Sequence, residues 1–159
     1  MGVRISSSAL NSTFTNMGMS TAIRQCPKER GRFDAFGGTI VKRMGDGTMS
    51  TFPSSLAAVL AAVAIQRELA AQEVPVRIGI HVGEVMLEPG DMIGDAVNIA
   101  SRIESFAVPG GVMLSDSACD QLKNRNEVEV VSLGRFRLKN VGRPFELYAD
   151  SQAHLIAPR

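Results

Sequence analysis

The sequence predicts an α+β fold in which a mainly antiparallel sheet is flanked by helices. A Gly-Asp-Gly turn at residues 45–47 separates two β-like runs within 39–52, which is typical of a hairpin. Residues 76–82 alternate as a strand does, whereas 91–106 carry an apolar stripe at helical spacing. Hairpins interleaved with helices are typical of a layered α+β domain.

The other elements follow from local signals. Pro53-Ser54-Ser55 is a helix start with a serine cap, and Ser115 or Asp116 caps a later helix. The remaining predicted strands are 3–5, 85–87, 112–114, 128–133 and 145–148. The remaining predicted helices are 16–23, 32–36, 55–68 and 116–123. We expect one domain over residues 1–150 and a loose tail over 151–159.

Composition excludes several classes of protein. The chain has 159 residues and a formal net charge of +1, so it has no nucleic-acid footprint. Its two cysteines, Cys26 and Cys119, are too few for a disulfide framework and fit a reducing compartment. The longest apolar run, 56–65, is too short to cross a membrane. These features predict a cytoplasmic protein with free thiols and no membrane segment.

The hairpin carries two candidate functional residues. Its glycines would hold Asp46 at the tip with a free carboxylate, a hard oxygen ligand suited to Mg²⁺ or Mn²⁺. Strand alternation places Lys42 on the same face as Ile40 and Met44, where its charge needs an acidic partner or a ligand. The alternative is a structural hairpin whose aspartate is only solvated.

A second candidate group lies on the predicted helix 91–106. Asn98 and Arg102 are four residues apart, so they share a helical face beside a carboxylate at Asp91. An Asn and an Arg stacked in this way could hold a sugar and a phosphate. The alternative is the polar flank of an amphipathic helix. His81 lies within a predicted strand and is interpreted as structural.

Most of these candidate residues belong to four sequence motifs that follow one another along the chain. They are 37–47, ending in Lys-Arg-Met-Gly-Asp-Gly; 77–85, Arg-Ile-Gly-Ile-His-Val-Gly-Glu-Val; 94–102, Gly-Asp-Ala-Val-Asn-Ile-Ala-Ser-Arg; and Pro-Gly-Gly at 109–111. Together they resemble the class III nucleotidyl cyclases, the adenylate and guanylate cyclase catalytic domain. The resemblance covers residues 33–150 and implies the ferredoxin-like cyclase fold.

The resemblance also implies roles for individual residues. Asp46 matches one of two aspartates that bind a catalytic metal pair, Mg²⁺ or Mn²⁺. Lys42 and Asp91 match the pair that reads the purine. Asn98 matches the residue that orients the ribose, and Arg102 matches the one that stabilises the transition state at the α-phosphate.

Lys139 matches a residue that contacts the terminal phosphates. The implied reaction converts ATP to cyclic AMP and pyrophosphate by attack of the ribose 3′-oxygen on the α-phosphate. The implied assembly is an antiparallel homodimer in which each site combines residues of both subunits.

The sequence departs from the family at its first strand. The family's other metal aspartate has no counterpart before Asp34, and alignment of residues 6–10 with the family motif places Gly2 or Val3 there. Three readings follow: a cyclase, a non-catalytic dimerisation or nucleotide-sensing module on the cyclase fold, and a polymerase-palm-like protein with coincidental motifs.

Overall fold

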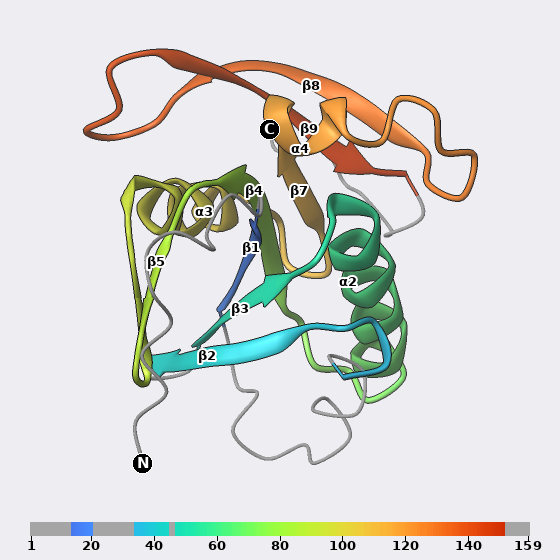
Figure 1. Ribbon diagram of the computed structural model, residues 1–159. Helices are drawn as coiled ribbons and strands as arrows, with labels where there is room; N and C mark the ends of the chain where they lie inside the picture. Colours follow the sequence, from blue (N-terminus) through green and yellow to red (C-terminus); the bar gives the residue numbers. More distant parts are fainter. Residues whose placement is uncertain (1–13, 21–33, 45–46, 152–159) are drawn as a thin grey trace.

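The computed structural model describes residues 14–20, 34–44 and 47–151. A seven-stranded sheet, in the order β2-β3-β1-β4-β7-β9-β8, forms its centre (Figure 1). Only the β4–β7 pair is parallel among the described pairings. The strands are β1 (Phe14–Ser20), β2 (Thr39–Met44), β3 (Gly47–Phe52), β4 (Arg77–Gly83), β7 (Val112–Ser115), β8 (Val130–Arg137) and β9 (Pro144–Asp150). Two further strands, β5 (Met86–Glu88) and β6 (Asp91–Ile93), pair only with each other.

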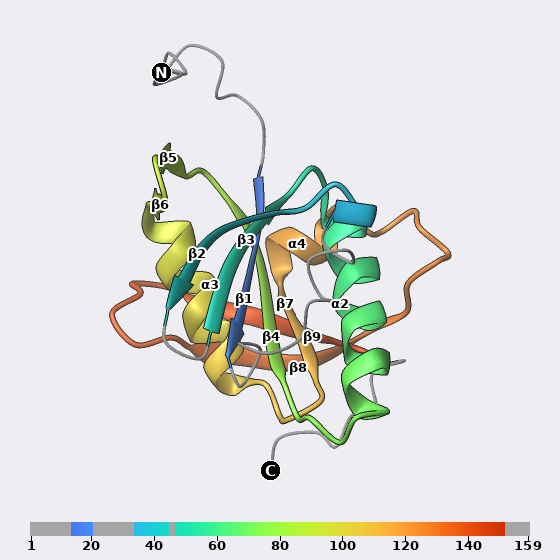
Figure 2. The same ribbon diagram turned by 90° about the horizontal axis from the view of Figure 1, so that it is seen from below.

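Helices cover both faces of the sheet. Alternate residues of β4 divide between them: Ile78 and Ile80 pack under α2 (Ser55–Ala70), whereas Gly79 faces α3 (Asp95–Phe106). Figure 2 shows the two helices on opposite sides of the central strands. A short helix, α4 (Asp116–Asp120), follows β7. This arrangement confirms the predicted α+β class.

A β-bulge in β2 corrects the predicted orientation of Lys42. The pairing with β3 shifts between Ile40, opposite Ser50, and Lys42, opposite Met49. Ile40 consequently packs in the α2 layer, whereas Met49 belongs to the α3 layer. The prediction that Lys42 shares a face with Ile40 is therefore wrong, because the extra residue of a bulge reverses the alternation.

The N-terminal predictions have two outcomes. The strand predicted at 3–5, and with it Gly2 and Val3, lies outside the described residues. The helix predicted at 16–23 is wrong where it can be checked, since Phe14–Ser20 is strand β1, hydrogen-bonded between β3 and β4. Pairing on both edges overrides the weak helical pattern.

The helix predicted over 91–106 also needs correction. Asp91–Ile93 is strand β6, which pairs with β5 around a turn where Gly90 has φ +71°. Helix α3 begins only at Asp95. Its last residue, Phe106, was predicted to join the apolar stripe but remains 36% exposed.

Most of the remaining elements match their signals with shifted ends, and the helix predicted at 32–36 lies partly outside the described residues. The Ser54 hydroxyl caps α2 by accepting from the Ala57 N–H at 3.1 Å, and the Ser115 hydroxyl caps α4 by accepting from the Ala118 N–H at 3.3 Å. The strand predicted at 128–133 is β8 (Val130–Arg137), and the helix predicted at 116–123 ends at Asp120. Within the described ranges, no helix is long and apolar enough to span a membrane.

Candidate active site

Two predicted site residues from distant parts of the chain form an ion pair. Lys42 Nζ on β2 donates to Asp91 Oδ1 on β6 at 2.9 Å, although 49 residues separate them. The Met92 N–H donates to the same oxygen at 2.8 Å. These two hydrogen bonds, with Lys42 the stronger influence, lower the pKa of Asp91 below its ordinary value. Asp91 is therefore an anionic acceptor at neutral pH.

Helix α3 is held unusually close to β4. A methyl group on Gly79 would meet the Glu104 backbone, with its Cα at 2.8 Å, and the Ala100 carbonyl oxygen at 2.7 Å. A methyl group on Gly83 would lie 2.6 Å from the Ala96 Cβ. The glycines of the 77–85 motif thus allow the helix to rest directly on the strand. This close packing fixes where the outer face of α3 lies.

The outer face of α3 presents the other predicted residues. Asn98 is exposed and Arg102, half-buried, lies one helical turn further along, about 6 Å. Arg102 and Lys139 line one open cleft with a volume of about 350 Å³. The structure thus brings Lys42 to Asp91, next to the start of α3, and Arg102 to Lys139 towards its end.

Four further residues, among them Leu138, line this cleft. Ser105 and Phe106 come from the last turn of α3, and Arg137 comes from the end of β8. The rings of Phe106 and Phe136 lie 5.4 Å apart, so the helix and strand are in contact here. Arg137 stands two residues before Lys139 in the sequence, but no local pattern indicates that β8 lies beside α3.

Asp46, the predicted metal ligand, lies outside the described residues. In the pairing of the neighbouring strands, Ser20 of β1 stands opposite Gly47, the residue after Asp46. Strand β1, Phe-Thr-Asn-Met-Gly-Met-Ser, has no carboxylate. Among the described residues, no cluster of three or more His, Cys, Asp or Glu side chains could hold a metal ion. The described residues therefore supply no pair of carboxylates for a metal ion at this edge of the sheet.

His81 is part of the core. Its Nδ1 shares a hydrogen bond with the Ser115 hydroxyl at 2.8 Å, and its ring meets Phe145 edge-on at 5.9 Å between centroids. Burial lowers the pKa of His81 from 6.5 to about 4, so the ring is neutral at physiological pH. The contacts agree with the structural interpretation of this residue.

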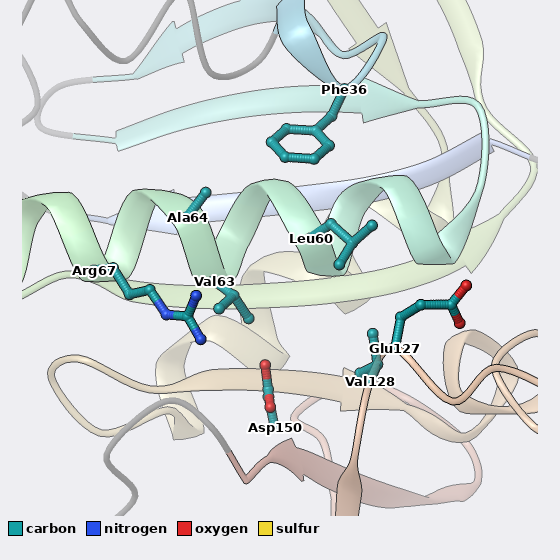
Figure 3. A pocket seen from close by; sticks show the side chains of 8 residues that line it. All are labelled: Phe36, Leu60, Val63, Ala64, Arg67, Glu127, Val128 and Asp150. Atoms are coloured by element: carbon teal, nitrogen blue, oxygen red, sulfur yellow. The ribbon is translucent and has the colours of Figure 1, made fainter.

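A second hollow of about 300 Å³ lies away from these residues (Figure 3). Apolar side chains of α2, among them Leu60 and Val63, form one wall, and Val128 and Asp150 form the other. None of the predicted site residues lines it. The cleft beside α3 is therefore the candidate active site.

Comparisons with known proteins identify the family of the chain. The sequence profile of the adenylate and guanylate cyclase catalytic domain matches residues 42–154. A putative adenylate cyclase 3 of Rhizobium meliloti is 36% identical over 122 residues, which cover 72% of this chain and 21% of that protein. An adenylate cyclase of Glutamicibacter nicotianae is 29% identical over 124 residues, covering 76% of this chain and 31% of that protein. The chain thus spans between a fifth and a third of the length of these relatives.

Solved structures agree in fold. An adenylate/guanylate cyclase/hydrolase from Silicibacter pomeroyi superposes with a TM-score of 0.74 at 28% identity, covering 86% of this chain and 95% of that one. An adenylate cyclase structure from Trypanosoma brucei gives a TM-score of 0.78 at 21% identity, over 94% and 93% of the two chains, and so supports the fold alone. These matches rule out coincidental motifs on a polymerase palm. The chain belongs to the adenylate and guanylate cyclase catalytic-domain family of class III nucleotidyl cyclases.

Proposed function

We propose that this chain binds ATP along the outer face of α3 and converts it to cyclic AMP and pyrophosphate. The observation that carries the proposal is the Lys42–Asp91 ion pair near the start of α3, with the basic cleft of Arg102 and Lys139 near its end. A base-reading pair and a phosphate-binding cleft joined by one helix match the two ends of a nucleotide.

Hydrogen-bonding chemistry favours adenine. Adenine offers an acceptor at N1 and a donor at its 6-amino group. Lys42 can only donate, and Asp91 can only accept because its lowered pKa keeps it ionised. Guanine presents the reverse order, a carbonyl acceptor and an N1–H donor, and would leave polar groups unpaired. The two side chains form a hydrogen bond with each other at 2.9 Å. A bound adenine would replace this contact by accepting from Lys42 and donating to Asp91.

Residues of α3 would position the reacting atoms. Asn98 would orient the ribose so that its 3′-oxygen faces the α-phosphorus. Attack there forms the bond from the 3′-oxygen to phosphorus and breaks the bond to the β-phosphate, so pyrophosphate leaves with the bonding electrons while the 3′-hydroxyl proton passes to water. Arg102 would meet the charge that develops on the α-phosphate oxygens, and Lys139 would hold the terminal phosphates.

A divalent ion, Mg²⁺ or Mn²⁺, would be bound through Asp46 together with phosphate oxygens of the substrate. When bound, it would act as a Lewis acid that neutralises phosphate charge. Strand β1 contributes no carboxylate, so Asp46 would be the charged protein ligand of this ion.

A homodimer would complete the site. In the family the metal aspartates come from one subunit and the base, ribose and phosphate residues come from its partner. The β5–β6 pair offers a surface for this contact: Met86 is 60% exposed and Ile93 is 43% exposed, beside the Lys42–Asp91 ion pair. Exposed apolar side chains gathered on a small projecting hairpin favour a protein contact.

A second candidate function is a nucleotide-binding dimerisation module with little turnover. The absence of Asp and Glu from β1 favours it, because a second ion, one that would activate the attacking oxygen, would find no carboxylate on this strand. The two candidates share nucleotide binding and differ in rate.

The test measures ATP and GTP competition by calorimetry and cyclic AMP formation with Mn²⁺ in parallel. We expect ATP to bind at least tenfold more tightly than GTP, roughly the value of one well-paired hydrogen-bonding site. Lys42→Met should abolish the preference. GTP binding equal to ATP binding would refute the adenine assignment. ATP binding with no cyclic AMP would select the second candidate.

A carboxylate restored to β1 separates the candidates further. Ser20 pairs with Gly47, so Ser20→Asp would add a carboxylate to the strand residue that pairs next to the hairpin turn, and Ser20→Asn is a control of the same size without the charge. If the missing ligand limits the rate, Ser20→Asp raises cyclic AMP formation and Ser20→Asn does not. Equal rates in both variants and the parent would show that the rate is limited elsewhere.

A further inference from the structure

The cleft beside α3 gathers three cationic side chains that have no acidic partner. Arg102, Arg137 and Lys139 all line it, and within the described part of the chain none of them forms an ion pair. Two other cations are paired: Arg77 lies 3.3 Å from Glu104, and Arg143 lies 3.6 Å from Asp116. Like charges held together without a counter-charge favour a multivalent anion in the space between them.

We propose that Arg137 is a substrate-binding residue that holds the pyrophosphate end of the nucleotide and sets the preference for triphosphates. The proposal rests on the proposed function and adds a residue that neither the sequence motifs nor the reaction required. Arg137 ends β8, and the next residue, Leu138, is buried in the core with Ile103 and Phe145. Because the buried Leu138 stands between Arg137 and Lys139 in the sequence, it holds both cations at one rim of the cleft.

The contacts around β8 show that Arg137 and its neighbour Arg135 occupy different positions relative to the cleft. Phe136 packs against Phe106 of α3, which ties this part of β8 to the helix that carries Arg102. Arg135 has the same charge, is also exposed, and lies on the same strand, but it does not line the cleft. An arginine fork donates two parallel hydrogen bonds to a phosphate, which suits the two outer phosphates better than the single centre of a lysine.

The experiment compares Arg137→Ala with the matched control Arg135→Ala in the full chain. Calorimetry would measure the affinities of ATP, AMP and inorganic pyrophosphate at fixed ionic strength, and thermal unfolding would check that both variants are folded. We expect Arg137→Ala to weaken ATP and pyrophosphate about tenfold, the effect of one lost charge-assisted contact, with AMP changed less than twofold. Arg135→Ala should leave all three within twofold. Arg137→Lys should recover part of the loss.

Each alternative result counts against the inference. Equal pyrophosphate affinities for the two alanine variants would show that Arg137 does not bind pyrophosphate. An equal loss of AMP and pyrophosphate would show a general structural effect. No measurable pyrophosphate binding by the parent chain would also overturn it. Failure of the proposed function would give a different result. ATP would yield no cyclic AMP, but pyrophosphate binding would still depend on Arg137, and the inference would stand.

Discussion

Substitution of Gly79 by alanine should damage both stability and function through the position of α3. The added methyl group would lie 2.7 Å from the Ala100 carbonyl oxygen and 2.8 Å from the Glu104 Cα, against 3.4 Å for ordinary contact. Both obstacles belong to helix backbone, so a side-chain rotation cannot relieve them. The helix must move by about 0.7 Å or more. Overpacking of this kind costs about 1–3 kcal/mol of unfolding free energy.

The displaced helix also carries Asn98 and Arg102. A misplacement near 1 Å lowers a catalysed rate by up to about 10²-fold. Urea denaturation measures the stability loss, and ATP affinity with cyclic AMP formation measures the functional loss. Gly142→Ala is the matched control, because a methyl group there meets nothing within 4 Å. The reasoning is refuted if Gly79→Ala is as stable as Gly142→Ala and binds ATP normally.

Three other predictions test the core, the pH response and the assembly. Gln66 donates to two buried backbone carbonyls at 2.9 and 3.0 Å, and each carbonyl also accepts from a backbone N–H, so Gln66→Leu should cost about 1–2 kcal/mol in urea denaturation, whereas the exposed Gln72→Leu should cost little. Because the pKa of His81 falls from 6.5 to about 4 on folding, the unfolded chain binds the proton more readily in that interval. Stability should therefore fall as the pH drops from 6.5 towards 4, and a His81→Gln variant should show a smaller fall between pH 7 and 5. If the parent chain turns over ATP, mixing inactive Asp46→Ala and Arg102→Ala chains should restore activity by forming one intact site per heterodimer, and no rescue in confirmed dimers would contradict the shared site.

Local patterns in the sequence predicted the parts of the fold and site that local geometry determines. The Ser54 cap and the hairpin around Gly47 depend on residues a few positions apart, and both are confirmed. Placing Asn98 and Arg102 on one helical face needs only the period of a helix. The motifs also selected Lys42 and Asp91 as a pair, and their side chains lie 2.9 Å apart in the structure, while their role at the purine stays a prediction.

Long-range pairing decided the features that the sequence did not predict. The bulge beside Val41 has no local sequence signal, yet it turns Lys42 towards the layer that contains Met49 and Met92. The sequence pattern places Asp91 in the predicted helix 91–106, but the residue joins strand β6, because β5 supplies its hydrogen-bond partners. Arg137 joins the cleft only because β8 lies beside α3.

Binding and turnover should separate in this protein, because they depend on different edges of the site. The residues proposed to read the base and hold the phosphates lie on β2, β6, α3 and the end of β8, where the described contacts place them together. The edge that would hold the metal depends on Asp46 and on β1, which has no acidic residue. An interaction made chiefly in the transition state affects kcat more than substrate binding. Loss of one such electrostatic contact typically lowers kcat by about 10²-fold or more. A chain that binds ATP with ordinary affinity and cyclises it slowly is the result that this division of the site implies.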